Sequence, residues 1–245
     1  MKQILLFGLL LLLTACGVPE ESTPAPTPEA IHIKNPTALK PWADKIAVCA
    51  SSNPLIALYF NQSSTQDNNI GINEVALELG ETSHLDVASY LSQIGWEQIV
   101  VIVNQDNELS HLPTGMLQSI YSGQTSGRDN DSGQPIQVWV LPNGDPVRMY
   151  FDRAVLQSNS LTSEAMLAPD PEAMLETISL DANAIGYLPE SILSAHDPNL
   201  VSKVKIIQLD TSLQEELYLP VIALSHSEPG GLIRELLVCV QSAVP

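Results

Sequence analysis

Two hydrophobic patterns alternate along most of the chain. Short, continuous apolar runs rich in β-branched residues are typical of strands buried on both faces. Other segments repeat apolar residues every three to four positions, as amphipathic helices do. The predicted strands are 45–50, 96–104, 136–141, 184–189, 204–209 and 219–225. The predicted helices are 54–60, 112–123, 146–157, 170–180 and 231–242. This alternation predicts an α/β fold with mainly parallel sheets.

Two junctions between a predicted strand and a predicted helix carry polar residues. They are Ser51-Ser52-Asn53-Pro54 and Asn143-Gly144-Asp145-Pro146. Each sets a capping residue beside a proline, which suits the first turn of a helix. Ligands bind at the carboxyl ends of strands in open α/β sheets, and helix starts there offer free N–H groups. The alternative is that both junctions are simply well-capped helices.

The first residues predict export. Lys2 precedes a short apolar stretch, Ile4 to Leu13, which is too short to span a bilayer and is typical of a signal peptide. Leu13-Thr14-Ala15-Cys16 resembles a bacterial lipobox, which implies cleavage before Cys16 and lipidation of its thiol. A plain secretory peptide is the alternative. We therefore expect a lipoprotein signal peptide over 1–16.

Residues 17–42 begin with a segment rich in Pro, Thr and Glu, "VPEESTPAPTPEA", that has no apolar period. Such composition keeps a chain extended, so we predict a linker that separates the folded body from the membrane.

Cys49 and Cys239 are the two cysteines of the expected folded body. An oxidising, exported setting would allow them to pair. Both lie in apolar runs, "IAVCA" and "LLVCV", where buried free thiols are also common. The sequence leaves both alternatives open.

Charge and motifs exclude several functions. The 245 residues include 10 Lys plus Arg and 28 Asp plus Glu, a formal net charge of −18, which repels nucleic acid. No Gly-x-Ser-x-Gly motif or phosphate-binding P-loop is present, so we expect no enzyme and no cofactor. The histidines show no metal-ligand spacing, so we expect no metal site. They are His32, His84, His111, His196 and His226.

The order of three segments resembles a known family. "WEQIVVIVNQDNELSHLPTGMLQSIYSGQ" is followed by "QPIQVWVLPNGDPVRMYFDRAVL" and "NAIGYLP". Together they resemble the phosphate-binding-protein-like branch of type 2 periplasmic solute-binding proteins, over about Lys45 to Gln241. The resemblance implies two α/β lobes joined by hinge strands, with a small-molecule solute in the cleft. The lobes would be 43–101 with 202–245, and 102–201.

The same resemblance implies a partner and a location. Such proteins deliver solutes to ABC-type permeases, so we expect a substrate-binding component of an importer, held on the extracytoplasmic face of the cell membrane by the lipid anchor. The alternative is a surface scaffold or sensor lipoprotein that keeps the lobes and binds no small molecule.

One position departs from the family. Phosphate-binding relatives carry a Ser-Gly-Thr-type triplet where this chain has Asp145-Pro146-Val147. Proline has no N–H, and a carboxylate would repel an anion, so phosphate itself is doubtful. Asp145 either caps its helix or faces the cleft, and Arg148 faces either the cleft or Asp152. The candidate ligand-binding residues are Ser51, Ser52, Asn53, Asp145, Arg148 and Tyr187.

Overall fold

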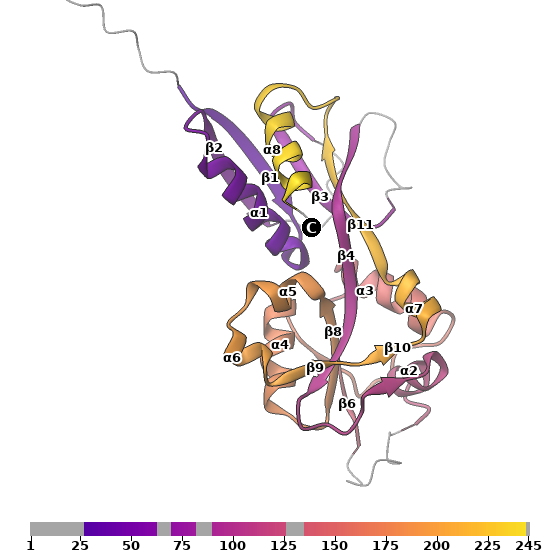
Figure 1. Ribbon diagram of the computed structural model, residues 1–245. Helices are drawn as coiled ribbons and strands as arrows, with labels where there is room; N and C mark the ends of the chain where they lie inside the picture. The colour runs from indigo at the N-terminus through magenta and orange to yellow at the C-terminus, as the bar shows by residue number, and fades with distance from the viewer. Residues whose placement is uncertain (1–26, 63–69, 82–89, 126–134, 244–245) are drawn as a thin grey trace, which may run out of the picture.

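The chain folds into two lobes that are joined by two long strands (Figure 1). The computed structural model describes residues 27–62, 70–81, 90–125 and 135–243. Strand β4 (Tyr90–Asn104) pairs antiparallel with β11 (Tyr218–Ser225) over its first part, and with β8 (Ala184–Pro189) from Ile99 onward. Because β4 runs through both lobes, its middle residues form the hinge region.

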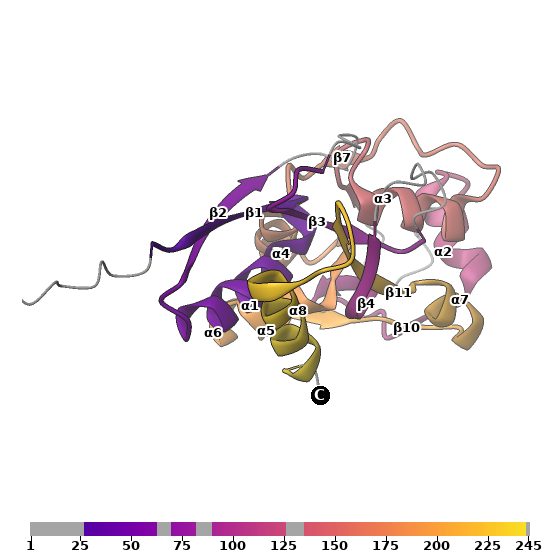
Figure 2. The ribbon, with the colours of Figure 1, turned by 90° about the horizontal axis from the view of Figure 1, so that it is seen from above.

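The first lobe contains a sheet with the strand order β2-β1-β3-β11-β4. Strands β1 (Glu29–Asn35), β2 (Ile56–Gln62) and β3 (Glu74–Leu79) are parallel. Figure 2 shows helices α1 (Lys40–Ser51) and α8 (Gly231–Ser242) together on one side of these strands. A single 3-10 turn, η1 (Thr37–Leu39), connects β1 to α1.

Two sequence predictions in this lobe are wrong. Residues 45–50 lie in helix α1, and 54–60 lie mostly in strand β2. The apolar run "KIAVCA" is too short for its pattern to distinguish a strand from a helix. The structure buries Trp42, Ile46 and Ala50 at helical spacing and leaves Val48 70% exposed, so α1 is an amphipathic helix.

The predicted linker is also too long. Residues 29–35 form β1, with Ile31, Ile33 and Asn35 buried and their neighbours on the other face. This alternation is a strand pattern, but it comes directly after the Pro-rich segment and was included in the linker. The predicted signal peptide 1–16, including Cys16, lies outside the described residues.

The second lobe has a sheet in the order β4-β8-β6-β7, in which β8, β6 and β7 are parallel to one another. Strands β8 and β9 both pair antiparallel with β4. A separate pair joins β10 to β5. Its strands are β5 (His111–Leu112), β6 (Gln137–Val140), β7 (Met166–Leu167), β9 (Val204–Ile206) and β10 (Gln208–Leu209). Its helices are α2 (Thr114–Tyr121), α3 (Pro146–Phe151), the π-helix η2 (Asp152–Leu156), α4 (Pro171–Leu180), α5 (Glu190–Ala195), α6 (Pro198–Val201) and α7 (Thr211–Glu216).

The predicted elements from residue 96 onward occur in this order, although β4 begins earlier, at Tyr90. The short elements β5, β7, α5, α6 and α7 were not predicted. The predicted strand 204–209 is two short strands, β9 and β10. Because β9 pairs with the second-lobe part of β4, the chain returns to the first lobe along β11, and not at residue 202.

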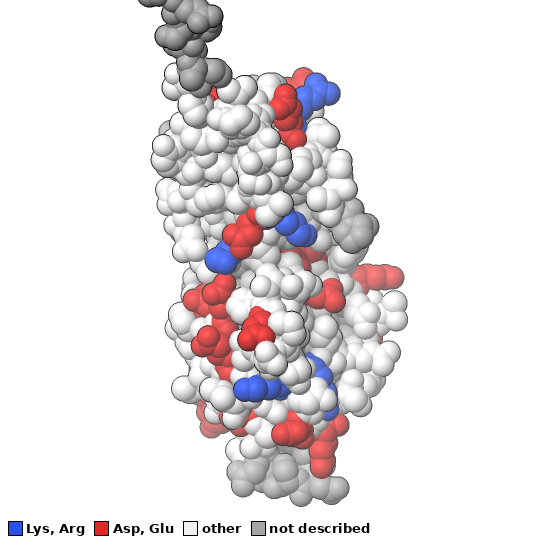
Figure 3. Space-filling view, turned by 60° about the vertical axis from the view of Figure 1, so that its left-hand side comes forward, with Lys and Arg blue, Asp and Glu red and all other residues white. Residues whose placement is uncertain are grey.

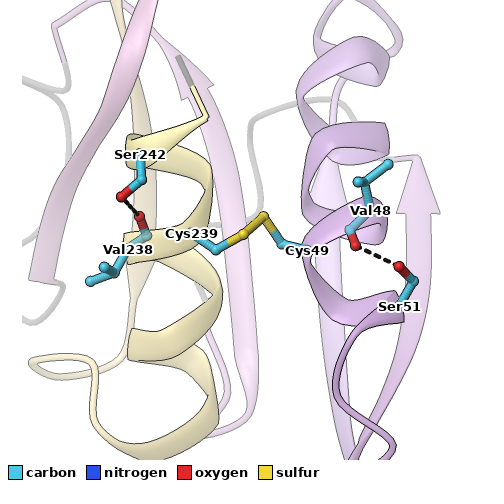
Figure 4. Close-up of a disulfide and its surroundings, with 6 residues drawn as sticks. All are labelled: Val48, Cys49, Ser51, Val238, Cys239 and Ser242. Carbon is cyan, nitrogen blue, oxygen red and sulfur yellow. Dashed lines mark hydrogen bonds between the residues drawn. A yellow bond between two sulfur atoms is a disulfide. The ribbon is translucent and has the colours of Figure 1, made fainter. Parts of the chain in front are cut away.

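Cys49 and Cys239 form a disulfide that connects α1 to α8 (Figure 4). Their Cα atoms are 6.0 Å apart, and the bond joins positions separated by 190 residues. Of the two alternatives left by the sequence, pairing is the one the structure contains. No helix among the described residues is long and apolar enough to cross a membrane.

Candidate ligand site

The lobes meet where strand ends of the first lobe face helix starts of the second. Turn η1 packs against β3 in its own lobe and against β8 in the other, while α3 packs against β3. The Tyr150 hydroxyl of α3 donates to the Glu81 carbonyl at 3.2 Å, just after β3. Lys40 at the start of α1 lies 3.6 Å from Glu172 at the start of α4. The helix starts that border this junction are the candidate ligand site.

The first-lobe helix start is at Thr37, which the sequence analysis missed. Buried Asn35 ends β1, and Pro36-Thr37-Ala38 opens η1. The first N–H groups of a helix have no acceptor within the helix, so those of Thr37 and Ala38 are suited to a ligand. The sequence signal was the Asn-Pro-Thr motif that follows a strand of alternating apolar and polar residues. It was overlooked because the neighbouring prolines led us to assign the whole segment to the linker.

Ser51, Ser52 and Asn53 lie at the opposite end of α1. The Ser51 hydroxyl donates to the Val48 carbonyl at 2.7 Å within the helix (Figure 4). Ser52 is the C-terminal cap of α1, and Asn53 donates to Glu235 of α8 at 3.3 Å. Twelve helical residues extend roughly 18 Å, so these side chains are a full helix length from the α1 start. Predicting them as a helix-start motif was wrong, because the strand assigned before them is a helix.

Asp145 is the N-terminal cap of α3. Its carboxylate accepts hydrogen bonds from Val147 N–H at 2.8 Å and Arg148 N–H at 3.3 Å. Burial raises the pKa of Asp145 to about 6, although these two N–H groups and the Arg148 charge act in the opposite direction. Pro146 has no N–H, so the chain's own carboxylate occupies the amides that would otherwise meet an anion. The capping alternative is therefore the observed one.

Arg148 pairs with Asp152, one of the two alternatives left by the sequence. Its Nε lies 3.2 Å from Asp152 Oδ2, and its Nη1 donates to the Leu141 carbonyl at 2.7 Å. These contacts connect α3 to the end of β6. Arg148 thus fixes the helix onto the strand that precedes it.

Tyr187 belongs to the core of the second lobe. It is fully buried, and its ring stacks on Phe151 with centroids 3.8 Å apart. Its hydroxyl accepts from Leu141 N–H at 3.4 Å, and burial raises its pKa well above the usual range for tyrosine. The hypothesis that it approaches the cleft is wrong, because every residue of β8 is buried.

A buried carboxylate in the hinge connects the lobes. Glu97 of β4 is 3% exposed, and its Oε2 accepts from Trp42 Nε1 of α1 at 2.7 Å. Its Oε1 accepts from Ser191 N–H at 3.1 Å, at the start of α5. We define these three residues as the Glu97 junction. A glutamate two residues before the apolar run Ile99–Val103 was the sequence signal, and it was not singled out.

Tyr150 makes the contact on the other side of the lobe junction. Its ring lies so close to Gly80 that a Cβ there would fall 2.1 Å from ring and hydroxyl atoms. Gly80 also has a φ of +79°, which favours glycine. The lobes therefore touch through side chains at Glu97, at Tyr150 and at Lys40. Figure 3 shows charged side chains of both signs where the two lobes meet.

Among the described residues, no group of three or more His, Cys, Asp or Glu side chains could hold a metal ion. The arrangement offers helix N–H groups, hydroxyls and one desolvated carboxylate.

These features define the fold of type 2 periplasmic binding proteins, as predicted. The chain resembles a proposed phosphate ABC transporter substrate-binding protein from Clostridium perfringens, solved with bound phosphate, at TM-score 0.71 and 17% identity, covering 86% of this chain and 93% of that one. An ABC-type phosphate transport receptor from Vibrio cholerae gives TM-score 0.64 and 16% identity, with 87% and 94% covered.

The same fold occurs outside transport. The reduced OxyR regulatory domain from Pseudomonas aeruginosa matches at TM-score 0.64 and 12% identity, covering 89% of this chain and all (100%) of that one. The sequence matches no protein-family model, and no curated protein matches it. At these identities the structural likeness shows the fold.

Proposed function

We propose that this protein is a lipid-anchored extracytoplasmic solute-binding protein and the substrate-binding component of an ABC-type importer. The observation that carries the proposal is the junction itself: η1, which begins at Thr37, and α3, which Asp145 caps, both pack against β3 where the lobes meet. A solute held there contacts both lobes and favours the closed arrangement. The lipobox-like Cys16 supports the membrane location.

The solute we propose is uncharged or cationic, rather than phosphate. At pH 7 Asp145 is mostly ionised, because its pKa is about 6. A second negative charge about 4 Å away would cost about 4 kcal/mol in a partly screened site. That is roughly a thousandfold in affinity. For this reason we do not propose phosphate as the solute, although the Clostridium perfringens protein was solved with bound phosphate.

The test is mass spectrometry of solute carried through native purification, followed by calorimetric titration of that solute. Thr37→Ala removes a hydroxyl at the site, whereas Ser52→Ala changes a hydroxyl-bearing residue at the far end of α1 and is the matched control. We expect Thr37→Ala to weaken binding about tenfold and Ser52→Ala to leave it unchanged. Equal effects of the two changes would contradict the proposed site.

A scaffold or sensor that binds no solute is the second candidate. The contacts at Glu97, Tyr150 and Lys40 favour it, because they hold the lobes together with protein groups alone. Thermal unfolding across a panel of sugars, amino acids, amines and oxyanions distinguishes the two candidates. A ligand-dependent rise in Tm supports solute binding, and no rise with any compound supports the scaffold.

A further inference from the structure

A pocket lies along the flank of α1, and neither Thr37 nor Asp145 lines it. Its volume is about 490 Å³, within the range of small-molecule sites. Helices α1 and α8 of the first lobe and α5 of the second form its walls, so we name it the hinge pocket. The wall residues used below are Asp44, Lys45, Val48, Cys49, Ser191, Ala195 and Cys239.

Most of the wall is apolar, and the disulfide contributes to it. Both Cys49 and Cys239 belong to the wall, and Figure 4 shows the bond that joins α1 to α8. Val48 and Ala195 add aliphatic surface from the two lobes. Such walls favour an apolar ligand body.

Two polar groups of the wall have no hydrogen-bond or ion-pair partner among the described residues. The Ser191 hydroxyl is buried and has no hydrogen-bond partner among the described residues. The Lys45 ammonium lies 3.9 Å from the Trp42 ring centroid, and within the described part of the chain it forms no ion pair. Burial lowers the pKa of Lys45, with Glu97 acting in the opposite direction. Both groups donate hydrogen bonds, so a complementary ligand must present an acceptor.

The surrounding charges select an uncharged acceptor. Glu97 lies beside both donors, since it accepts from Ser191 N–H and interacts with Lys45. Asp44 is also in the wall and pairs with Lys40 at 3.2 Å. Lys45 would attract a carboxylate ligand but the two acids would repel it, and the reverse holds for an ammonium ligand, so neither charged end gains a net advantage.

We propose that the hinge pocket binds a small uncharged amphiphile, whose apolar body packs between α1, α5 and α8 while an alcohol, ketone or amide oxygen accepts from Lys45 and Ser191. The occupant contacts both lobes. This site does not depend on solute binding at Thr37 and Asp145.

Octanol, octanoate and octylamine share one tail and differ in the charge of the polar end, so they are suitable probes. The full-length protein is titrated with each probe and followed by amide NMR shifts. We expect saturable shifts in α1, α5 and α8 with octanol, weaker binding of octanoate and octylamine, and a raised Tm with octanol. No saturable shifts with octanol would overturn the proposal, and tighter binding of octanoate would overturn the uncharged class.

Variants test the location. Ala195→Phe fills the pocket from an exposed position at the end of α5 and should abolish octanol binding. Lys45→Met keeps the apolar stem and should weaken binding about fivefold, the effect of one hydrogen bond. Lys203→Met, the same change on an exposed residue outside the wall, is the matched control. Octanol binding that Ala195→Phe leaves intact would place the probe elsewhere and contradict the proposal.

Discussion

The Glu97 carboxylate satisfies two donors from different lobes with its two oxygens, the buried Trp42 Nε1–H and the partly buried Ser191 N–H. A glutamine has one acceptor oxygen, so Glu97→Gln leaves either Trp42 Nε1–H or Ser191 N–H facing an amide NH₂. A buried donor without an acceptor costs about 1–3 kcal/mol. We expect that loss of unfolding free energy in urea denaturation. Glu190→Gln, an exposed change beside Ser191, should lose less than about 0.5 kcal/mol.

If the two variants have the same unfolding free energy, Glu97 does not stabilise the hinge. Trp42→Phe provides an independent check, because it removes only the indole donor and part of the ring. Its effect should be partly shared with Glu97→Gln, so the double variant is less destabilised than the sum.

Asp145 predicts a specific pH dependence of stability. Its pKa is about 6 in the folded protein and 3.8 in the reference state, so the folded chain binds more protons between these values. Unfolding free energy therefore falls as pH rises from about 4 to about 6, by about 1–3 kcal/mol for this group. Asp145→Asn keeps a good N-cap and should flatten that part of the profile.

The measurement is chemical denaturation at several pH values between 4 and 7. Asp197→Asn is the control, because Asp197 caps α6 through Asn199 N–H at an exposed position. A pH profile that Asp145→Asn leaves unchanged would contradict the burial of this carboxylate.

At the scale of elements, helix α1 and strand β4 are in contact through Trp42 and Gly95. A Cβ at Gly95 would fall 2.2 Å from the Trp42 ring, which is itself buried. Gly95→Ala therefore requires the helix and the strand to move apart. We expect a loss of about 2–3 kcal/mol, as for an overpacked core.

Gly115→Ala is the matched control for that substitution. Gly115 lies in the first turn of α2 with open space around its Cβ position, so alanine should be neutral or stabilise by up to about 1 kcal/mol. Thermal unfolding of both variants measures the difference. Equal Tm values would show that α1 is not packed on β4 as described.

The same scale explains which parts of the fold were predictable. Strands and helices after residue 96 have long or well-capped patterns, such as Asp170-Pro171 at the start of α4. Residues 45–60 contain short apolar runs whose type is decided by contacts with distant elements, including α8 through Cys49–Cys239. Sequence patterns do not contain those contacts, so helix and strand were exchanged there.

Site residues were predicted correctly only where the helices and strands around them were assigned correctly. Asp145 and Arg148 were placed at a helix start, because Asp-Pro after a strand is a local signal. Ser51 to Asn53 were predicted to start a helix, but they lie at the end of α1. The helix start at Thr37 was missed. Glu97 and Tyr150 act through partners far along the chain, so no local pattern could identify them.

At the scale of the whole molecule, the disulfide closes nearly all of the described chain. It joins positions separated by 190 residues, and the loop-entropy argument gives about 5 kcal/mol for a loop of that size. We expect a reductant to lower the urea midpoint of the oxidised protein markedly. A Cys49→Ala and Cys239→Ala double variant should unfold at that lower midpoint with or without reductant. A midpoint that reductant does not change would contradict the stabilising role.

The arrangement of the lobes gives a test of whether the protein closes by itself. Tyr150 packs on Gly80 and donates to the Glu81 carbonyl, so it stabilises the closed arrangement without a ligand. Tyr150→Ala removes about 1–2 kcal/mol from that arrangement, which shifts the ratio of closed to open molecules about tenfold. We expect a larger radius of gyration by small-angle X-ray scattering.

Tyr59→Ala is the control, because Tyr59 is an exposed tyrosine on the edge strand β2 and makes no interlobe contact among the described residues. An importer component would close again when its solute is added to the Tyr150 variant, since the solute favours the closed state. A scaffold would remain expanded with every compound. An unchanged radius for Tyr150→Ala would contradict a role of Tyr150 in holding the lobes together, and the remaining contacts at Glu97 and Lys40 would then hold them.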